Sequence, residues 1–139
     1  MSRSEYLGIA QRWLATAEND LRVASVLLDN KAFAHACFTA QQAAEKAVKA
    51  VWYADSGDPW GHSVQKLLSG LPGELREPPG RHLLEDAAGL DRLYIPTRYP
   101  NGLPDLTPAD TFFETDARRA IDQAGRIIDY CRGEVDARG

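Results

Sequence analysis

The sequence predicts an all-α protein: an antiparallel up-and-down bundle of four or five helices, in a single domain over residues 1–139. Apolar residues recur at intervals of three and four in three long segments, which is the period of an amphipathic helix. One of these segments is rich in alanine, the residue with the highest helix propensity. No stretch of four or more residues shows strand alternation between turn residues.

The first two helices are predicted from their apolar faces. The first spans Ser4 to Asn30, where Ser4 would cap the N-terminus. The second spans about Ala32 to Ala54, and small residues on its inner face would let a neighbouring helix approach closely. The expected stripe of the first helix is Tyr6, Ile9, Ala10, Trp13, Leu14, Ala17, Leu21, Ala24 and Leu28. The expected inner face of the second is Phe33, Ala36, Ala40, Ala43, Ala44, Ala47, Val48 and Val51.

The rest of the chain predicts two shorter helices and a final long one. The shorter helices span His62–Leu71 and Arg81–Tyr94, with a linker rich in proline and glycine between them. The last helix spans Thr107–Cys131. Pro108 at its first position and Asp110 in its first turn are helix start signals.

Composition excludes several classes of protein. The net charge of −4 argues against broad, non-specific binding to nucleic acid, although a local basic site remains compatible with it. No apolar run approaches the roughly 18 residues of a membrane span, and the first residues contain no signal-peptide core. Cys37 and Cys131 form neither a disulfide framework nor a metal-binding spacing. We therefore expect a cytoplasmic protein with no membrane, metal or cofactor.

A loop of nearly twenty residues, from Leu90 to Pro108, separates the last two helices, with Arg98 and Tyr99 near its centre. Polar residues in loops more often serve binding than core contacts. One interpretation is phosphate capture by Arg98, with a base stacked on Tyr99 or Tyr94. The alternative is structural: the two tyrosines seal the end of the bundle, and Arg98 pairs with a helix carboxylate.

Three further polar residues are candidates for the same pocket. Gln42 and Lys46 share a helix face because they are four residues apart. They either form a solvated surface or flank a pocket under the loop and help to hold a nucleotide. Asp20 borders the stripe of the first helix, where it would orient Arg98 or Lys46, or lie on the surface.

Three motifs in this order are similar to the HEPN domain family (higher eukaryotes and prokaryotes nucleotide-binding). They are AENDLRVASVLL at 17–28, FTAQQAAEKAVKAV at 38–51 and LDRLYIPTRYPN at 90–101. The resemblance implies a helical bundle, commonly a homodimer. It also implies a minimal nucleotidyltransferase partner, frequently in a toxin–antitoxin pair. Many members are metal-independent ribonucleases, with an arginine four to six residues before a histidine near the start of the last helix.

That ribonuclease motif is absent at its expected place, because no histidine follows Arg98. Arg98 would supply the cation that stabilises charge on a phosphate, but a base of near-neutral pKa is missing beside it. The pair Arg76 and His82 has a permitted spacing. It spans Pro78–Gly80, however, and we interpret it as a linker arginine and a residue at a helix start.

Two functions are therefore predicted, beside a purely structural alternative in which the chain is a helical oligomer with no ligand. The first is a dimeric module that binds a nucleotide or an RNA phosphate through Arg98, Tyr99 and Lys46 without cutting. The second is a divergent ribonuclease in which His62, remote in sequence, replaces the missing base. His62 would need to lie within about 10 Å of Arg98 for this second function. His35 is expected to be an ordinary helix residue.

Overall fold

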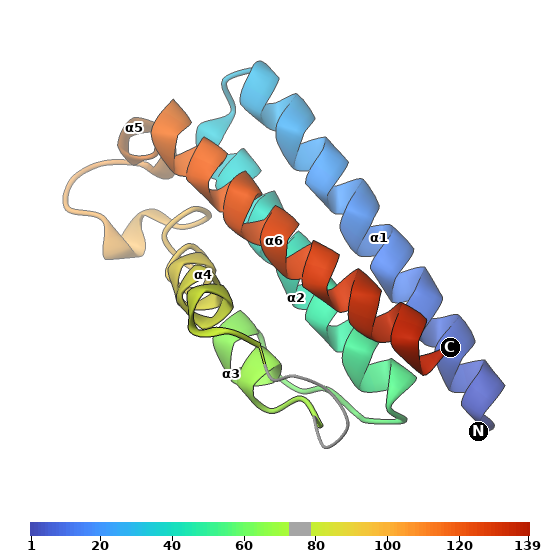
Figure 1. The fold of residues 1–139 in the computed structure, drawn as a ribbon. Coiled ribbons are helices and arrows are strands. Elements are labelled where there is room, and N and C mark those ends of the chain that lie inside the picture. The colour runs from blue at the N-terminus through green and yellow to red at the C-terminus, as the bar shows by residue number, and fades with distance from the viewer. Residues whose placement is uncertain (73–78) are drawn as a thin grey trace.

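The computed structural model describes residues 1–72 and 79–139. Within these residues the protein contains helices and no strands, which confirms the all-α prediction (Figure 1). The helices are α1 (Arg3–Asp29), α2 (Phe33–Ala54), α3 (Val64–Ser69), α4 (Arg81–Asp91), the 3₁₀ helix η1 (Pro100–Gly102), α5 (Pro108–Thr111) and α6 (Glu114–Arg138).

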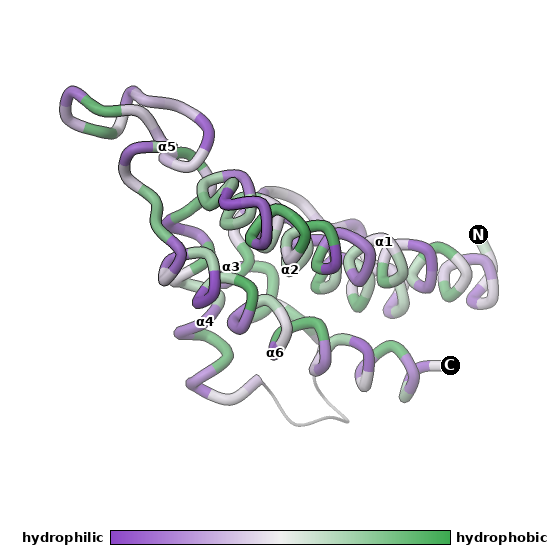
Figure 2. The backbone as a smooth tube through the Cα atoms, turned by 90° about the horizontal axis from the view of Figure 1, so that it is seen from above, coloured by the Kyte–Doolittle hydropathy of each residue, from purple (hydrophilic) through white to green (hydrophobic). Residues whose placement is uncertain are grey.

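The long helices form an up-and-down bundle. α1 and α2 run antiparallel, joined by a tight turn in which Lys31 has a φ of 61°. α6 packs against both of them, and α4 lies antiparallel to α6 on the other side, with α3 against it. Both chain ends lie at one end of the bundle, whereas α5 and the loop before it lie at the other (Figures 1 and 2).

α2 lies at the centre of the core, and its predicted inner face is buried except for Phe33, which is half-buried. Alanine at five of these positions lets α6 approach closely. α2 and α6 run in the same direction, since Arg138 at the end of α6 hydrogen-bonds to Asp55 at the end of α2. Along each long helix, hydrophobic and hydrophilic residues alternate with the helical period (Figure 2).

The start of α1 differs from the prediction. Ser2, rather than Ser4, is the N-cap. Its Oγ accepts a hydrogen bond from the Glu5 amide at 3.1 Å, and Glu5 Oε1 accepts one from the Ser2 amide at 3.3 Å. This reciprocal capping box needs an acid or amide three residues after the cap, which Ser4 lacks because Leu7 occupies that position.

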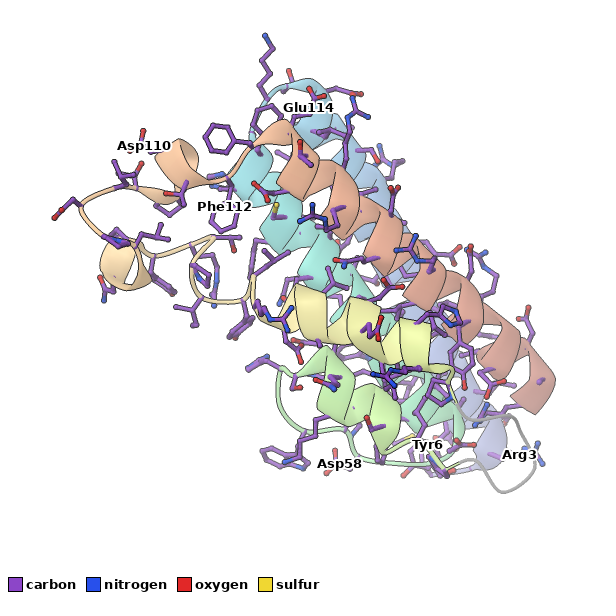
Figure 3. The ribbon with its side chains drawn as sticks, turned by 60° about the vertical axis from the view of Figure 1, so that its left-hand side comes forward. Arg3, Tyr6, Asp58, Asp110, Phe112 and Glu114 are labelled. Atoms are coloured by element: carbon purple, nitrogen blue, oxygen red, sulfur yellow. The ribbon has the colours of Figure 1, made fainter. Side chains whose placement is uncertain are left out.

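The last predicted helix is divided in two, and this corrects the sequence prediction. Thr107 and Pro108 do start a helix, but it ends after four residues. Phe112 packs against the core while Phe113 stays 64% exposed, so the chain turns between them before α6 begins (Figure 3). α6 then continues past Cys131 to Arg138 because Val135 and Arg138 are still buried.

The two short helices are also shorter than predicted. α3 begins at Val64, and Ser63 is its N-cap, with Oγ accepting from the Lys66 amide at 3.0 Å. α4 ends at Asp91, and turns continue to Arg98. No described helix has the length and apolar character needed to span a bilayer.

Candidate functional site

The turn after α4 carries Arg98, which is half-buried, and Tyr99, which is exposed. The amides of both residues donate to the carbonyl of Ile95 at 3.1 Å. Thr97 is buried and its Oγ1 donates to the carbonyl of Leu93 at 2.5 Å. This local hydrogen bond from a side chain to the backbone stabilises the turn that precedes Arg98 and Tyr99.

The guanidinium of Arg98 is surrounded by three aromatic rings. Its Cζ lies 4.5 Å from the ring centre of Phe38, 4.4 Å from that of Tyr94 and 5.0 Å from that of Tyr99. Nε donates to the carbonyl of Tyr94 at 2.9 Å. Cation–π contacts and this one hydrogen bond therefore orient the side chain without neutralising its charge.

Arg98 makes no ion pair, and its Nη1 and Nη2 have no hydrogen-bond partner among residues 1–72 and 79–139. The structural alternative, in which Arg98 pairs with a helix carboxylate, is thus not found in this part of the chain. Tyr99 is 47% exposed, so it does not seal the end of the bundle. Arg98 and Tyr99 together present unpaired N–H donors beside an exposed aromatic face.

His62 lies next to the same ring of Tyr94. The two rings stack with centres 4.8 Å apart and planes 17° apart. His62 Nδ1 lies 3.3 Å from Glu45 Oε1, and the Glu45 carboxylate also accepts from Lys49 Nζ at 3.2 Å. Gly61, with a φ of 89°, precedes His62 and turns the chain toward α2.

Tyr94 brings His62 and Arg98 together. The His62 ring centre is 4.8 Å from that of Tyr94, and Arg98 Cζ is 4.4 Å from the same ring centre. The imidazole and the guanidinium carbon are therefore at most about 9 Å apart, which is the combined length of these two distances. This upper bound is below the separation of about 10 Å beyond which the second predicted function would be rejected.

A small surface pocket of about 180 Å³ opens beside this cluster, lined by His62, Ser63, Asp91 and Tyr94. Asp91, the last residue of α4, accepts hydrogen bonds from Ser63 Oγ at 2.7 Å and from the Val64 amide at 2.6 Å. The carboxylate thereby joins the end of α4 to the start of α3. This connection holds the stacked rings of His62 and Tyr94 beside the pocket.

The other predicted residues lie elsewhere on α1 and α2. Lys46 Nζ pairs with Asp20 Oδ2 at 2.6 Å, so Asp20 contacts Lys46 rather than Arg98. Lys46 lines a different pocket, of about 250 Å³, together with Arg12, Trp13 and Thr16. Gln42 Nε2 donates to Gln41 Oε1 at 2.7 Å and so supports the buried residues beneath His62.

The remaining histidines do not contribute to this cluster. His35 is exposed on α2, and His82 is exposed in the first turn of α4. Arg76, the partner of His82 in the alternative spacing, lies outside the described residues.

Three residues of the cluster were not predicted as parts of it: Phe38, Gln41 and Glu45. Gln41 is fully buried, and its Nε2 donates to the carbonyl of His62 at 3.3 Å. The sequence signal for Phe38, Gln41 and Glu45 is their spacing of three and four residues, which places all three on one face of α2. Gln41 and Glu45 are polar residues on a helix face that is otherwise mostly alanine. Buried polar side chains need hydrogen-bond partners, so these two residues indicate a buried hydrogen-bond network.

Comparison with known proteins identifies the family. The model of the HEPN domain matches residues 10–134. Three solved structures are similar: TT1696 from Thermus thermophilus, the archaeal HEPN homologue ST0689, and the HEPN domain protein tm0613 from Thermotoga maritima. A search of curated proteins returned no match.

These structures agree with the chain over most of its length. The Thermus protein is 39% identical with a TM-score of 0.85, covering 90% of this chain and 97% of its own. The archaeal protein is 32% identical with a TM-score of 0.77, covering 91% and 97%. The Thermotoga protein is 32% identical with a TM-score of 0.68, covering 88% and 95%. The chain therefore belongs to the HEPN domain family.

Proposed function

We propose that this HEPN domain binds the phosphate of a nucleotide or of RNA through Arg98. The observation that carries the proposal is the unpaired guanidinium edge, held in place by three aromatic rings. A guanidinium is suited to this role because its planar fork donates two parallel hydrogen bonds to phosphate oxygens. Tyr99 is half-exposed beside it and offers a face on which a base can stack.

The family supports a biological setting for this module. We propose that it acts as a homodimer beside a minimal nucleotidyltransferase, in a toxin–antitoxin type of system. Lys46 belongs to the proposed ligand contacts only if its ion pair with Asp20 opens, because that pair occupies its ammonium group. Gln42 acts indirectly, through its hydrogen bond to Gln41.

A second function, metal-independent RNA cleavage, is favoured by one specific observation. Glu45 and His62 form a carboxylate–imidazole pair, and the His62 ring centre lies at most about 9 Å from Arg98 Cζ. With Nδ1 facing Glu45, Nε2 of His62 would accept the proton of a ribose 2′-hydroxyl. The 2′-oxygen would then attack phosphorus, and the 5′-oxygen would leave and take a proton from water. Arg98 would stabilise the charge on the phosphate.

One experiment separates these functions. Wild type, Arg98→Ala, His62→Ala and the control Arg22→Ala are mixed with ATP, AMP and end-labelled RNA in the presence of EDTA. Binding and cleavage are measured in the same samples. The binding function predicts intact RNA and a loss of affinity with Arg98→Ala alone. Cleavage that disappears with both Arg98→Ala and His62→Ala would instead establish the ribonuclease. An affinity that Arg98→Ala leaves unchanged, together with RNA that stays intact even with the wild type, would overturn both.

A further inference from the structure

A second groove lies on the other side of the turn that ends α4. It has a volume of about 230 Å³ and runs between α4 and the start of α6. Its lining residues are Gly89, Arg92, Leu93, Asp116, Arg119 and Gln123. Two of them are arginines, and they belong to different helical segments that meet at this groove.

Neither arginine has a partner among residues 1–72 and 79–139. Of the arginine side chains in the described part of the chain, only Arg12, Arg92 and Arg119 have no hydrogen bond, ion pair or ring contact. Two of these three therefore line one groove. Five other arginines, Arg81, Arg118, Arg126, Arg132 and Arg138, form ion pairs with acidic side chains, so two arginines without such a pair at one place are a local concentration of positive charge.

Among the residues that line the groove, Asp116 offsets one of the two positive charges, so the lining has a net charge of +1. Asp116 accepts a hydrogen bond from the Phe113 amide at 2.9 Å, so one of its oxygens is directed to the start of α6. Gln123 lies over Gly89, where a Cβ would come within 2.8 Å of its Nε2. The absence of a side chain at Gly89 lets this amide donor lie against α4 and contribute to the groove wall.

The groove and the Arg98 site share one short stretch of backbone. Asp91 and Tyr94 line the pocket beside His62, whereas Arg92 and Leu93 line the groove toward α6. Consecutive Cα atoms are about 3.8 Å apart, so the two cavities flank a single turn. A polymer that crosses this turn can reach both of them.

We propose that the α4–α6 groove is a second phosphate subsite, and that the ligand of this domain is a single strand of RNA rather than a mononucleotide. This inference rests on the proposed function, since it extends the Arg98 site. One phosphate binds at Arg98, and another phosphate of the same strand binds between Arg92 and Arg119. A mononucleotide reaches the Arg98 site alone.

The test compares a labelled oligouridylate with AMP as ligands. The variant is Arg92→Gln/Arg119→Gln, and the matched control is Arg22→Gln/Arg81→Gln, which removes the same charge from exposed arginines that line neither cavity. Arg98→Gln is measured in parallel, and circular dichroism checks that every variant is folded. Affinities are determined over a range of salt concentrations.

We expect the Arg92→Gln/Arg119→Gln variant to bind the oligouridylate at least about tenfold more weakly than the control, with AMP affinity unchanged. Its slope of log affinity against log salt should fall by about 0.7, because each phosphate neutralised on a single strand contributes about 0.7. Equal oligouridylate affinities for variant and control would overturn the subsite, while an Arg98-dependent AMP affinity would still support the proposed function. If Arg98→Gln changes neither ligand's affinity, the proposed function fails and the second subsite fails with it.

Discussion

The carboxylate of Glu45 is almost fully buried and lies 3.3 Å from Nδ1 of His62, whose own side chain is 59% exposed. A residue of the central helix thus holds a surface histidine in place. The same carboxylate accepts a hydrogen bond from Lys49, so Glu45 links the core of the bundle to the candidate site. This link makes the site sensitive to changes within α2.

Glu45→Ala is expected to lower the free energy of unfolding by about 3 kcal/mol. Removing one partner of a buried ion pair leaves the other charge buried and unpaired. Here that charge is Lys49, whose side chain is only 13% exposed. Urea unfolding followed by circular dichroism measures the loss. Glu85→Ala is the control, because Glu85 also forms an ion pair with a residue four positions away, Arg81. Both side chains of this pair are exposed, and such a pair contributes less than about 1 kcal/mol. Equal losses in the two variants would contradict a buried network under His62.

Gly61→Ala is expected to destabilise the protein by about 1–2 kcal/mol and to weaken ligand binding at the candidate site. The φ of 89° at Gly61 is unfavourable for any residue with a Cβ, although there is space around it. Relief of this strain would move His62 away from Tyr94. Thermal denaturation and AMP binding are measured beside Gly133→Ala, which has similar space within α6 and should gain about 0.5–1 kcal/mol. A stabilised Gly61→Ala variant would rule out strain at this position.

The sequence predicts α2 almost to the residue, since Ala32–Ala54 was expected and Phe33–Ala54 is observed. Alanine propensity and a clear apolar period agree there, and Gly57 follows soon after the end of the helix. The last helix shows the limit of local signals. Thr107 and Pro108 mark a true helix start, but the burial of Phe112, which breaks the helix, depends on its contacts with the core.

The candidate site was predictable as single residues and not as a cluster. Arg98, Tyr94 and His62 were each identified by their loop positions or by resemblance. Their convergence depends on the relation between α3 and α4, which the hydrogen bonds of Asp91 fix across a gap of more than twenty residues. Helical spacing also placed Gln42 and Lys46 on one face, but it could not show that α1 would pair Lys46 with Asp20.

Arg138→Ala is expected to destabilise the bundle by about 3 kcal/mol, although the residue lies next to the chain end. Its side chain is buried, donating to Asp55 Oδ1 at 2.5 Å and to the carbonyl of Pro72 at 3.2 Å. Asp55 Oδ2 is buried with no hydrogen-bond partner in the described structure. Loss of Arg138 would therefore leave both oxygens of this carboxylate without a side-chain partner.

The matched comparison for Arg138 is a double-mutant cycle with Asp55→Ala, measured by urea unfolding. Much of the cost of Arg138→Ala arises from the unpaired Asp55, so the double variant should lose clearly less stability than the two single losses combined. Strict additivity would show that the two side chains do not depend on each other.

The stability of the protein is expected to fall at alkaline pH, partly because of Cys37. Burial, with a further contribution from the charge of Asp116, raises the pKa of this thiol from its ordinary value of 9.0 to about 12. Burial also raises the pKa of the Cys131 thiol. Unfolding exposes these groups and lets them ionise at their ordinary pKa, so above about pH 9 the unfolded chain binds fewer protons than the folded protein. By linkage, stability is fully present below pH 9 and is lost as pH rises toward 12, by up to about 1.4 kcal/mol per pH unit for each thiol.

Cys37→Ala removes one of these groups, and its effect on the pH dependence is separable from its effect on core contacts. A cavity changes stability by the same amount at every pH, whereas loss of the thiol changes the slope. Urea unfolding between pH 7 and pH 11 should therefore show a shallower decline for Cys37→Ala than for wild type above pH 9. Parallel curves would mean that the Cys37 thiol ionises equally in the folded and unfolded protein, in contradiction to its complete burial between α2 and the rest of the core.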